Sequence, residues 1–396
     1  MGDLFRRSAG EFADMLADWL AVPEVQVECS GTASLYIALE YLKGRSSARK
    51  VVVLAFTCPL VAMAVQKAGL ELCLCDVAEH SLEFDLEKLA GVLGEDTLCV
   101  IATHWGGALT DAHAVRQLLA QHAPRAFLIE DCAQAFGGMV DGRTVGLVGD
   151  VSIFSFAVGK GLTLYEGGCL LAKDQTIKAG LRETGERLRQ RDTRAEWLRS
   201  LELAAYHVAY RPWLLPFVYG FPRRYWMNKG NLIKAYGDDL EAIPVHQVGR
   251  WRKQVGANAL TRLSSHLQAS RANFAFLQEA IAAEGLGHVA TSPSGALPAA
   301  TYLILTLDTA AQAAELIRQP ASYELGVTRQ FAFPLVDYPV LSAAVGSADT
   351  PQARRLSSRT VTLSTSPYSS RFERTQLLGL IRSVVSGAHR QLPRTS

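Results

Sequence analysis

Three groups of residues in this sequence could bind and act on one molecule, because of their chemical types and their spacing. Lys160 lies between two glycines in AVGKGL, shortly after an apolar run that contains Ser155. Asp131 closes another apolar run, FLIED, and would leave a carboxylate at the end of a strand. Ser30–Ala33, with the sequence SGTA, directly precedes the helical apolar pattern of Leu35–Leu42. An amine, a carboxylate and the free N–H groups of a helix N-terminus together suit an anionic, carbonyl-bearing cofactor.

Pyridoxal 5′-phosphate needs all three groups. A lysine forms a Schiff base with its aldehyde, and a carboxylate keeps its pyridine nitrogen protonated, so that the ring accepts electrons when a bond at the substrate's α-carbon breaks. Its phosphate needs backbone N–H groups. Simpler interpretations exist for each part: Lys160 in a solvated turn, Ser30 as an ordinary helix cap, and Asp131 as a cap for the residues after it.

Short apolar runs alternate with helical patterns between about residues 50 and 175, which predicts an α/β fold with a mostly parallel sheet. The predicted strands are Val51–Ala55, Leu72–Asp76, Leu98–Thr103, Phe127–Asp131, Val151–Phe156 and Cys169–Ala172. The predicted helices between them are Pro59–Ala68, Asp85–Leu93 and Asp111–His122. Ligands of open α/β sheets bind beyond the carboxyl ends of the strands. Polar residues stand at those ends: Thr57, Asp76, His104, Asp131 and Ser155.

The second half of the chain has a different pattern. An Arg-rich helical stretch, Leu181–Leu201, is followed further on by one long predicted helix, Val245–Ala283. After Leu286 come strand-like segments at 301–307 and 360–366, with helical stretches at Ala310–Arg318 and Phe372–Ser386, which is typical of a smaller α+β domain. We therefore expect a large domain over residues 1–245, with an aromatic insert at about 200–230, and a small domain over 246–396.

The insert reads AAYHVAYRPWLLPFVYGFPRRYW at Ala204–Trp226. His207, Arg211 and three prolines interrupt it too often for a helix that spans a bilayer, so no transmembrane segment is predicted. Its simplest interpretation is a buried or subunit-facing segment. The alternative is a surface that meets a lipid, an apolar substrate or an apolar partner.

The composition excludes several classes of protein. Forty basic and thirty-eight acidic residues among 396 give a net charge of +2, without the basic cluster that nucleic-acid binding requires. The seven cysteines form no CxxC pair, and no metal site is predicted. The first residues, MGDLFRRSAGEF, have no apolar stretch of signal-peptide length, and Arg6 stands where a myristoylation motif has Ser or Thr. We expect a cytoplasmic protein.

One stretch carries a family resemblance. IEDCAQAFGGMVDGRTVGLVGDVSIFSFAVGKGLTLYEGGCLLAKD, residues 129–174, closely resembles the DegT/DnrJ/EryC1/StrS family of sugar aminotransferases, which are pyridoxal-phosphate enzymes of fold type I. The upstream segments GTASL, FTCPLVAMAV and THWGG follow the order and spacing of that family. The resemblance is strong over residues 25–175 and diffuse beyond. It implies an aspartate-aminotransferase-like fold with a large α/β domain and a smaller C-terminal α+β domain.

The resemblance also implies roles for single residues. Lys160 would be the Schiff-base lysine and the catalytic proton shuttle, and Asp131 would pair with the pyridine nitrogen. Gln134 would contact the phenolic oxygen of the cofactor, and His104 would lie beside it. The phosphate would be held by Gly31, Thr32, Ala33 and Ser155.

The sequence departs from the family in two places. The family has an aromatic residue that stacks on the pyridine ring where this chain has Cys58, so Phe56 or Trp105 would have to substitute. The family's G-x-N-x-R element, which reaches the cofactor phosphate of the neighbouring subunit, is not recognisable. Arg250 in IPVHQVGRW is the candidate for its charge.

Other residues are candidates for the amide of the G-x-N-x-R element or for contacts with the substrate. Asn228 or Asn231 could supply the amide. Glu166, near the substrate mouth, and Arg329, in the C-terminal block LGVTRQFAFPLVDYP, are candidate substrate contacts together with Phe56, Trp105 and Arg250.

The sequence thus predicts an aminotransferase that uses a small-molecule amino donor such as glutamate and a keto sugar or related ketone as acceptor. Family members of fold type I are usually homodimers with active sites at the interface, and the resemblance implies the same here. Two alternatives remain: other α-carbon chemistry on a more apolar, non-nucleotide substrate, such as a lyase or dehydratase reaction, and a non-catalytic cofactor-binding sensor. Relatives that act as dehydratases replace the lysine with histidine, and Lys160 argues against that variant.

Overall fold

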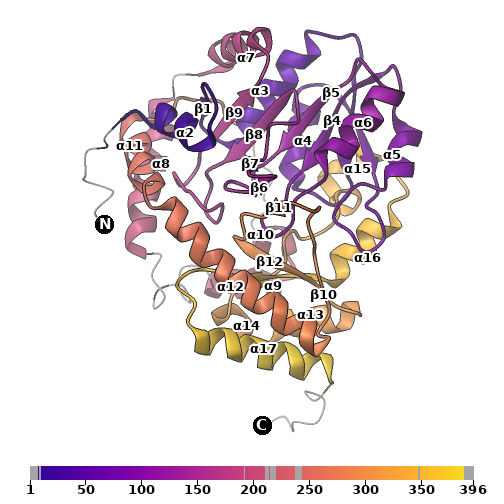
Figure 1. The fold of residues 1–396 in the computed structure, drawn as a ribbon, viewed down its shortest axis with the longest axis vertical. Coiled ribbons are helices and arrows are strands. Elements are labelled where there is room, and N and C mark those ends of the chain that lie inside the picture. Colours follow the sequence, from indigo (N-terminus) through magenta and orange to yellow (C-terminus); the bar gives the residue numbers. More distant parts are fainter. Residues whose placement is uncertain are drawn as a thin grey trace.

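The computed structural model describes residues 8, 10–190, 192–209, 214, 220–236, 243–346 and 348–387. Figure 1 shows two layered parts that share one long helix. The indigo and magenta ribbon of the first half surrounds a large sheet, and the orange and yellow ribbon of the second half builds a smaller sheet with its own helices.

The large sheet has seven strands, and five of the six predicted strands run parallel in it. Their spatial order is β1 (Gln26–Glu28), β9 (Gly168–Ala172), β8 (Val151–Ser155), β5 (Phe127–Asp131), β4 (Thr97–Thr103), β2 (Lys50–Leu54) and β3 (Glu71–Cys75). β9 pairs antiparallel with β8, and β1 pairs antiparallel with β9. All six predicted strands are confirmed within one residue at each end. The three-residue β1 was missed, because so short a strand carries no readable alternation.

Both faces of this sheet are covered, which explains why its strands read as unbroken apolar runs. In β2, Val51 and Val53 belong to one buried cluster, and Val52 and Leu54 belong to the cluster on the opposite face. The two faces are covered by α2 (Phe12–Leu20), α3 (Gly31–Lys43), α4 (Pro59–Lys67), α5 (Leu86–Val92), α6 (Ala112–His122) and α7 (Gln175–Leu188).

Most of these helices begin where the sequence supplies a cap. The side chains of Ser30, Asp85, Asp111 and Asp174 each accept a hydrogen bond from an N–H group in the first turn of α3, α5, α6 and α7. Pro59 opens α4, at a position where its missing N–H has no intrahelical partner to lose. These caps fix where each helix starts relative to the preceding strand, and therefore fix the carboxyl edge of the sheet.

The small sheet is antiparallel, in the order β10 (His288–Val289), β12 (Tyr302–Thr306), β14 (Thr360–Ser364) and β13 (Val327–Thr328). Its apolar core is shared with the C-terminal half of α12 (Leu263–Glu284), α13 (Ala310–Arg318) and α17 (Arg371–Val385). α14 (Pro320–Glu324) precedes β13. The α+β character expected for this part is confirmed.

The long helix expected over Val245–Ala283 is wrong in one respect, because it is two helices. α11 (Arg250–Leu260) ends before α12 begins at Leu263. Thr261 Oγ donates a hydrogen bond to the carbonyl of Asn258 at 2.8 Å, and the Arg262 side chain donates to the same carbonyl at 3.3 Å. Side chains that satisfy a last-turn carbonyl in this way compete with helix continuation.

The Arg-rich stretch 181–201 is also divided, between α7 and α8 (Thr193–Ala209). Of the aromatic insert, 210–213 and 215–219 lie outside the described residues, and α9 (Phe221–Asn228) and α10 (Leu232–Tyr236) follow. The buried Arg223 of α9 lies over the rings of Tyr236 and Tyr323. Within the described part of the chain, no helix has the length and apolar character needed to cross a bilayer.

The domain boundary at 245/246 stays a prediction. The buried clusters show that segments from the C-terminal part of the chain also pack against the large sheet. Residues 332–345, which include η2 (Leu335–Asp337), η3 (Pro339–Leu341) and α15 (Ser342–Val345), pack in the core of the large part. α16 (Pro351–Arg359) contributes to the cluster on the other face of the large sheet. Three short strands, β11 (Ala296–Leu297), β6 (Met139–Val140) and β7 (Arg143–Thr144), join the two parts as a small separate sheet.

Candidate functional site

The polar residues predicted at strand ends do lie at one edge of the large sheet. Asp131 ends β5 and Ser155 ends β8, and these two strands are neighbours. His104 follows β4 on the other side of β5, and its N–H donates to the Asp131 carbonyl at 2.9 Å. Asp76 is different: its carboxylate accepts the first-turn N–H groups of Gln352 and Ala353, so it caps α16. The site is therefore centred on Asp131.

The N-terminus of α3 lies directly against Ser155. A Cβ placed on Gly31 would be 2.8 Å from Ser155 Cβ, so only glycine allows this approach. Ser30 accepts the N–H of Ala33 at 2.9 Å, which confirms Ser30 as the helix cap and occupies one of the three predicted phosphate donors. The N–H groups of Gly31 and Thr32 have no intrahelical acceptor by the geometry of a helix start. Together with the Ser155 hydroxyl they form a cradle for an anion.

Lys160 lies in the loop that returns from β8 towards β9. Gly159 and Gly161 on either side of it have φ angles of +83° and +85°, a region that favours glycine. Lys160 is partly buried, and its positive charge lowers the proton affinity of the Asp131 carboxyl. Lys160 thus lies near enough to Asp131 for its charge to act on the carboxylate.

Asp131 is almost completely buried, with 3% of its surface exposed. One of its carboxylate oxygens accepts the Ala133 N–H at 3.0 Å. Burial raises the pKa of Asp131, although this hydrogen bond and the charge of Lys160 oppose the rise. A buried carboxylate of this kind is stabilised by a cationic partner, which a protonated pyridine nitrogen would supply.

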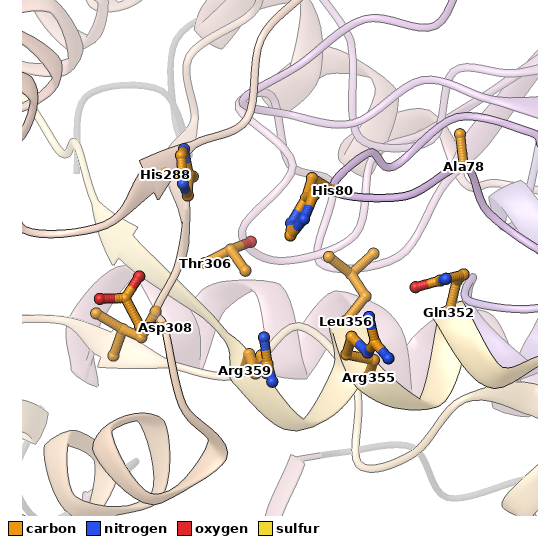
Figure 2. Close-up of a pocket in the computed structure, with 10 residues that line it drawn as sticks. Ala78, His80, His288, Thr306, Asp308, Gln352, Arg355, Leu356 and Arg359 are labelled. Carbon is orange, nitrogen blue, oxygen red and sulfur yellow. The ribbon is translucent and has the colours of Figure 1, made fainter.

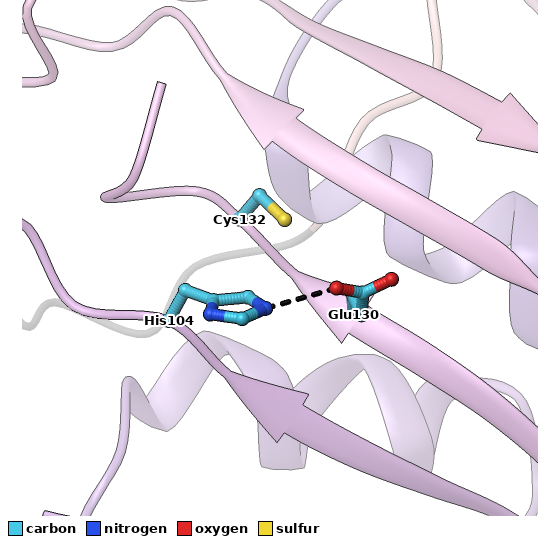
Figure 3. Close-up of side chains that lie close together, drawn as sticks. All are labelled: His104, Glu130 and Cys132. Carbon is cyan, nitrogen blue, oxygen red and sulfur yellow. Dashed lines mark hydrogen bonds and ion pairs between the residues drawn. The ribbon is translucent and has the colours of Figure 1, made fainter. Parts of the chain in front are cut away.

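His104 has both ring nitrogens occupied. The N–H of Thr110 donates to Nδ1 at 3.2 Å, so the ring proton is on Nε2, which lies 3.0 Å from Glu130 Oε2. Glu130 in turn accepts N–H groups of the 146–149 turn, including that of Val148 at 2.7 Å. Figure 3 shows the ring of His104 directed at this carboxylate. Both ring nitrogens of His104 therefore hold the surrounding backbone and Glu130 in place.

Cys132 lies beside this pair, and its sulfur is within 4.8 Å of the His104 and Glu130 ligand atoms (Figure 3). The three groups could in principle hold a metal ion. Burial raises the pKa of the Cys132 thiol well above its ordinary value, and the carboxylate of Glu130 is already hydrogen-bonded on both oxygens. Protonated sulfur and an occupied carboxylate fit a structural cluster better than a metal centre.

Gln134 is bound by two residues that the sequence did not single out. The Tyr302 hydroxyl donates to Gln134 Oε1, and Gln330 Nε2 donates to the same oxygen at 2.8 Å. Both donors belong to the C-terminal part of the chain. No sequence signal pointed to them, because Tyr302 reads only as one residue of the apolar strand TYLILTL.

The aromatic residues considered as ring-stacking groups form a cluster of their own. Phe56 and Trp105 stack on each other with centroids 5.7 Å apart, and Phe331 contacts both rings. Phe56 and Trp105 are 2% and 1% exposed, and the Trp105 indole N–H donates to the Leu82 carbonyl at 3.3 Å. These contacts place both rings in the core of the large part. Cys58, at the family's stacking position, is partly buried and caps α4.

Glu166 is bound to the scaffold on both sides. Its carboxylate forms an ion pair with Arg199 of α8, and its backbone carbonyl accepts from Arg252 of α11. Arg252 is fully buried, donates to the Leu164 carbonyl at 3.3 Å and forms two hydrogen bonds with Glu196. The sequence missed Arg252, which stands two residues after the predicted Arg250.

The contacts of the remaining candidates lie on other elements of the chain. Arg250 is exposed at the start of α11, and Asn228 is exposed at the end of α9. Asn231 accepts the N–H of Lys234 at 3.0 Å and so caps α10. Arg329 lies against α16, where its guanidinium is 3.5 Å from the Ser358 carbonyl.

A separate pocket of ≈ 110 Å³ lies between the loop after β3 and α16 (Figure 2). The rings of His80 and His288 face each other across it with centroids 6.1 Å apart. Its other lining residues are Ala78, Thr306, Leu307, Asp308, Gln352, Arg355, Leu356 and Arg359. None of these residues was a site candidate from the sequence, and the pocket is distinct from the Asp131 site.

Comparisons with known proteins agree with this arrangement. Residues 6–198 match the model of the DegT/DnrJ/EryC1/StrS aminotransferase family, which confirms the predicted resemblance over that stretch. The chain is similar to GDP-perosamine synthase of Vibrio cholerae, with 31% identity over 191 residues, 44% of this chain and 51% of the relative. It is also similar to L-glutamine:2-deoxy-scyllo-inosose aminotransferase of Streptomyces lividus, with 32% identity over 163 residues, 41% of this chain and 38% of the relative. The chain thus spans about half or less of these curated relatives.

The likeness in fold extends over nearly the whole chain. The PLP-form of Spr1654 from Streptococcus pneumoniae superposes with a TM-score of 0.72 at 16% sequence identity, covering 96% of this chain and 93% of that one. At this identity the match concerns the fold alone. It confirms the predicted architecture, a large mostly parallel sheet followed by a smaller C-terminal α+β part.

Proposed function

We propose that this chain is a pyridoxal-phosphate-dependent aminotransferase that transfers an amino group from a small-molecule donor to a keto sugar or a related cyclic ketone. The observation that carries the proposal is the buried Asp131 carboxylate, which lies within the influence of the Lys160 charge at the same sheet edge as the α3 N-terminus. The names of the two curated relatives, a perosamine synthase and an inosose aminotransferase, support the substrate class.

The residues present fit the cofactor. Asp131 is a buried carboxylate whose pKa is raised by burial, and it would gain a cationic partner from the pyridine nitrogen. The close approach of Gly31 to Ser155 builds a cradle of two backbone N–H groups and one hydroxyl, which suits a phosphate. Gln134 offers an amide three residues beyond Asp131.

Pyridoxal phosphate supplies an electron-accepting ring when it is bound. Lys160 would attach it through Nζ and, once displaced by the donor amine, would carry the proton to and from the substrate's α-carbon. Asp131 would keep the pyridine nitrogen protonated, and Gly31, Thr32 and Ser155 would hold the phosphate. The hydrogen-bonded ring of His104 and the turn held by Glu130 keep the Asp131 backbone in place.

The test is the visible spectrum of the purified protein with added pyridoxal phosphate. An absorption band that is lost on adding L-glutamate or L-glutamine and restored by a keto acid supports amino transfer. Lys160→Ala should abolish the band, whereas Lys173→Ala, at an exposed position just after β9, should leave it intact. A band that persists with every amino donor would point to other α-carbon chemistry, and an unchanged spectrum in Lys160→Ala would overturn the assignment.

A homodimer and a cytoplasmic location complete the proposal. α8 presents Trp197, Leu201 and Val208 to solvent with 67%, 47% and 55% of their surfaces exposed, and this spacing puts them on one helix face. Such an exposed apolar face supports a contact with a second subunit. Sedimentation velocity tests the dimer: Trp197→Glu should shift the species towards monomer, and a monomeric wild-type protein would refute it.

All seven cysteines are free, which supports a reducing compartment.

A further inference from the structure

We propose that Tyr302, together with Gln330, is a positioning residue that fixes the orientation of the Gln134 amide so that its NH₂ group faces the phenolic oxygen of the cofactor. This inference rests on the proposed function. It makes one contact of the cofactor ring depend on β12 and the residues after β13, that is, on the C-terminal part of the chain.

The direction of the hydrogen bonds follows from a backbone donor. The N–H of Gly106 donates to the Tyr302 oxygen at 3.1 Å. The Tyr302 hydroxyl has one proton, and it is directed at Gln134 Oε1, so the atom of Gln134 that faces Tyr302 is the amide oxygen. The chain of donors therefore runs from Gly106 through Tyr302 to Gln134.

The same oxygen, Gln134 Oε1, accepts a second hydrogen bond. Gln330 Nε2 lies 2.8 Å from Gln134 Oε1, and a carbonyl oxygen has two lone pairs. With both lone pairs used, the amide nitrogen of Gln134 must point away from the C-terminal part of the chain. Gln134 is 3% exposed, so turning the amide around would leave buried donors facing one another, which is unfavourable.

The glycine pair after Trp105 permits this contact. A Cβ on Gly106 would lie 2.6 Å from the Tyr302 ring, and a Cβ on Gly107 would lie 2.5 Å from the Tyr302 carbonyl oxygen. Larger residues at either position would push β12 away from Gln134. The WGG segment, noted in the sequence without an assigned role, thus serves the approach of Tyr302.

The Tyr302 hydroxyl stays protonated at all ordinary pH values. Burial raises the pKa of Tyr302, and the charge of Asp131 raises it further. A permanently protonated hydroxyl is a reliable donor to Gln134.

The experiment compares Tyr302→Phe with Tyr323→Phe, which removes the same hydroxyl from a tyrosine whose hydroxyl donates to the Met227 sulfur on α9. Two quantities are measured on each: the dissociation constant of pyridoxal phosphate, and the pH midpoint at which the visible absorption of the bound cofactor changes. Tyr302→Phe should weaken binding roughly 3- to 10-fold, the worth of one buried hydrogen bond. It should also move the midpoint upward, because a donor to the ring oxygen lowers the proton affinity of the ring system. Tyr323→Phe should change neither.

Two further variants test the same inference independently. Gln330→Met removes the other donor and should move the midpoint in the same direction, so the inference does not depend on one variant folding well. In Gln134→Leu, the added Tyr302→Phe change should have no further effect on binding. A wild-type protein without a visible band refutes the proposed function. A normal band with Tyr302→Phe and Gln330→Met indistinguishable from Tyr323→Phe refutes this inference alone.

Discussion

Arg252 and Glu196 form two hydrogen bonds between α11 and α8, and the same guanidinium donates to the backbone of the loop that follows Lys160. The carbonyls of Leu164 and Glu166 are its acceptors in that loop. Arg252 makes four hydrogen bonds in all, which a guanidinium with five N–H donors can supply and an ammonium with three cannot. The position of Lys160 therefore depends on two helices that are distant in the sequence.

Arg252→Met is expected to destabilise the protein by ~3–5 kcal/mol, because it leaves the partly buried Glu196 carboxylate without its partner. The loop at 161–166 should lose its anchor. Hydrogen exchange measured by mass spectrometry should show faster exchange there than in the wild-type protein. Arg250→Met, at an exposed position on the same helix, is the control and should leave both stability and exchange within error. Equal exchange in the two variants would contradict the anchoring role.

Glu130→Gln is expected to cost ~2–4 kcal/mol of unfolding free energy, measured by urea denaturation at pH 7. Burial acts to raise the pKa of Glu130, but hydrogen bonds from His104 and from Gly149 and Val148 outweigh it, and the pKa is lowered. A lowered pKa contributes stability above the unfolded value of about 4.3 and loses it as the pH falls through the folded value. The difference between wild type and variant should therefore shrink below about pH 4, and a constant difference would be evidence against this account.

Asp131→Asn should separate folding from cofactor binding. Since burial raises the pKa of Asp131, its charged form destabilises the apo protein as the pH rises above the ordinary value of about 3.9. The variant is expected to melt at the same temperature as the wild type or higher at pH 7, with the gap closing in acid. Its dissociation constant for pyridoxal phosphate should rise at least about 10-fold, since the protonated pyridine nitrogen loses its anionic partner. Calorimetry and a binding titration measure the two effects, and unchanged binding would remove Asp131 from the site.

Gly31→Ala should weaken the phosphate cradle, because the new methyl group would lie 2.8 Å from Ser155 Cβ. Binding of pyridoxal phosphate, followed by absorbance, should fall several-fold. Gly91→Ala in α5 is the matched control, since a Cβ there meets nothing within 4 Å, and it should stabilise the helix by up to ~1 kcal/mol. Adding Ser155→Gly to Gly31→Ala should recover thermal stability without recovering binding. Recovery of both would show that Ser155 is not a phosphate contact.

The large sheet could be predicted because each of its longer strands has a recognisable apolar sequence pattern. A strand buried on both faces must be apolar at every position, and β4 and β8 are buried along their whole length. The same reasoning located Asp131 and Ser155, because a polar residue that follows such a run must stand at the edge of the sheet. Lys160 and Gln134 needed the family resemblance as well.

The partners of these residues could not be predicted in the same way. Tyr302 and Gln330 reach Gln134 across 168 and 196 positions of sequence, and a contact of that range leaves no mark in local periodicity. Phe56 and Trp105 were candidates for stacking on the cofactor. The sequence does not show whether an aromatic residue packs against a ligand or, as these two do, against another aromatic ring. Arg252 was missed because the sequence of a helix start does not show which arginine is turned inward.

The 22-residue helix α12 has its first turns in the core of the large part, through Leu263 and Leu267, and its later turns in the core of the small part, through Leu277 and Ile281. At 1.5 Å per residue it is a rod about 33 Å long. A rod clamped at both ends by tight packing leaves no free joint along its length. A change in the relative position of the two cores would therefore have to tilt α12 as a whole.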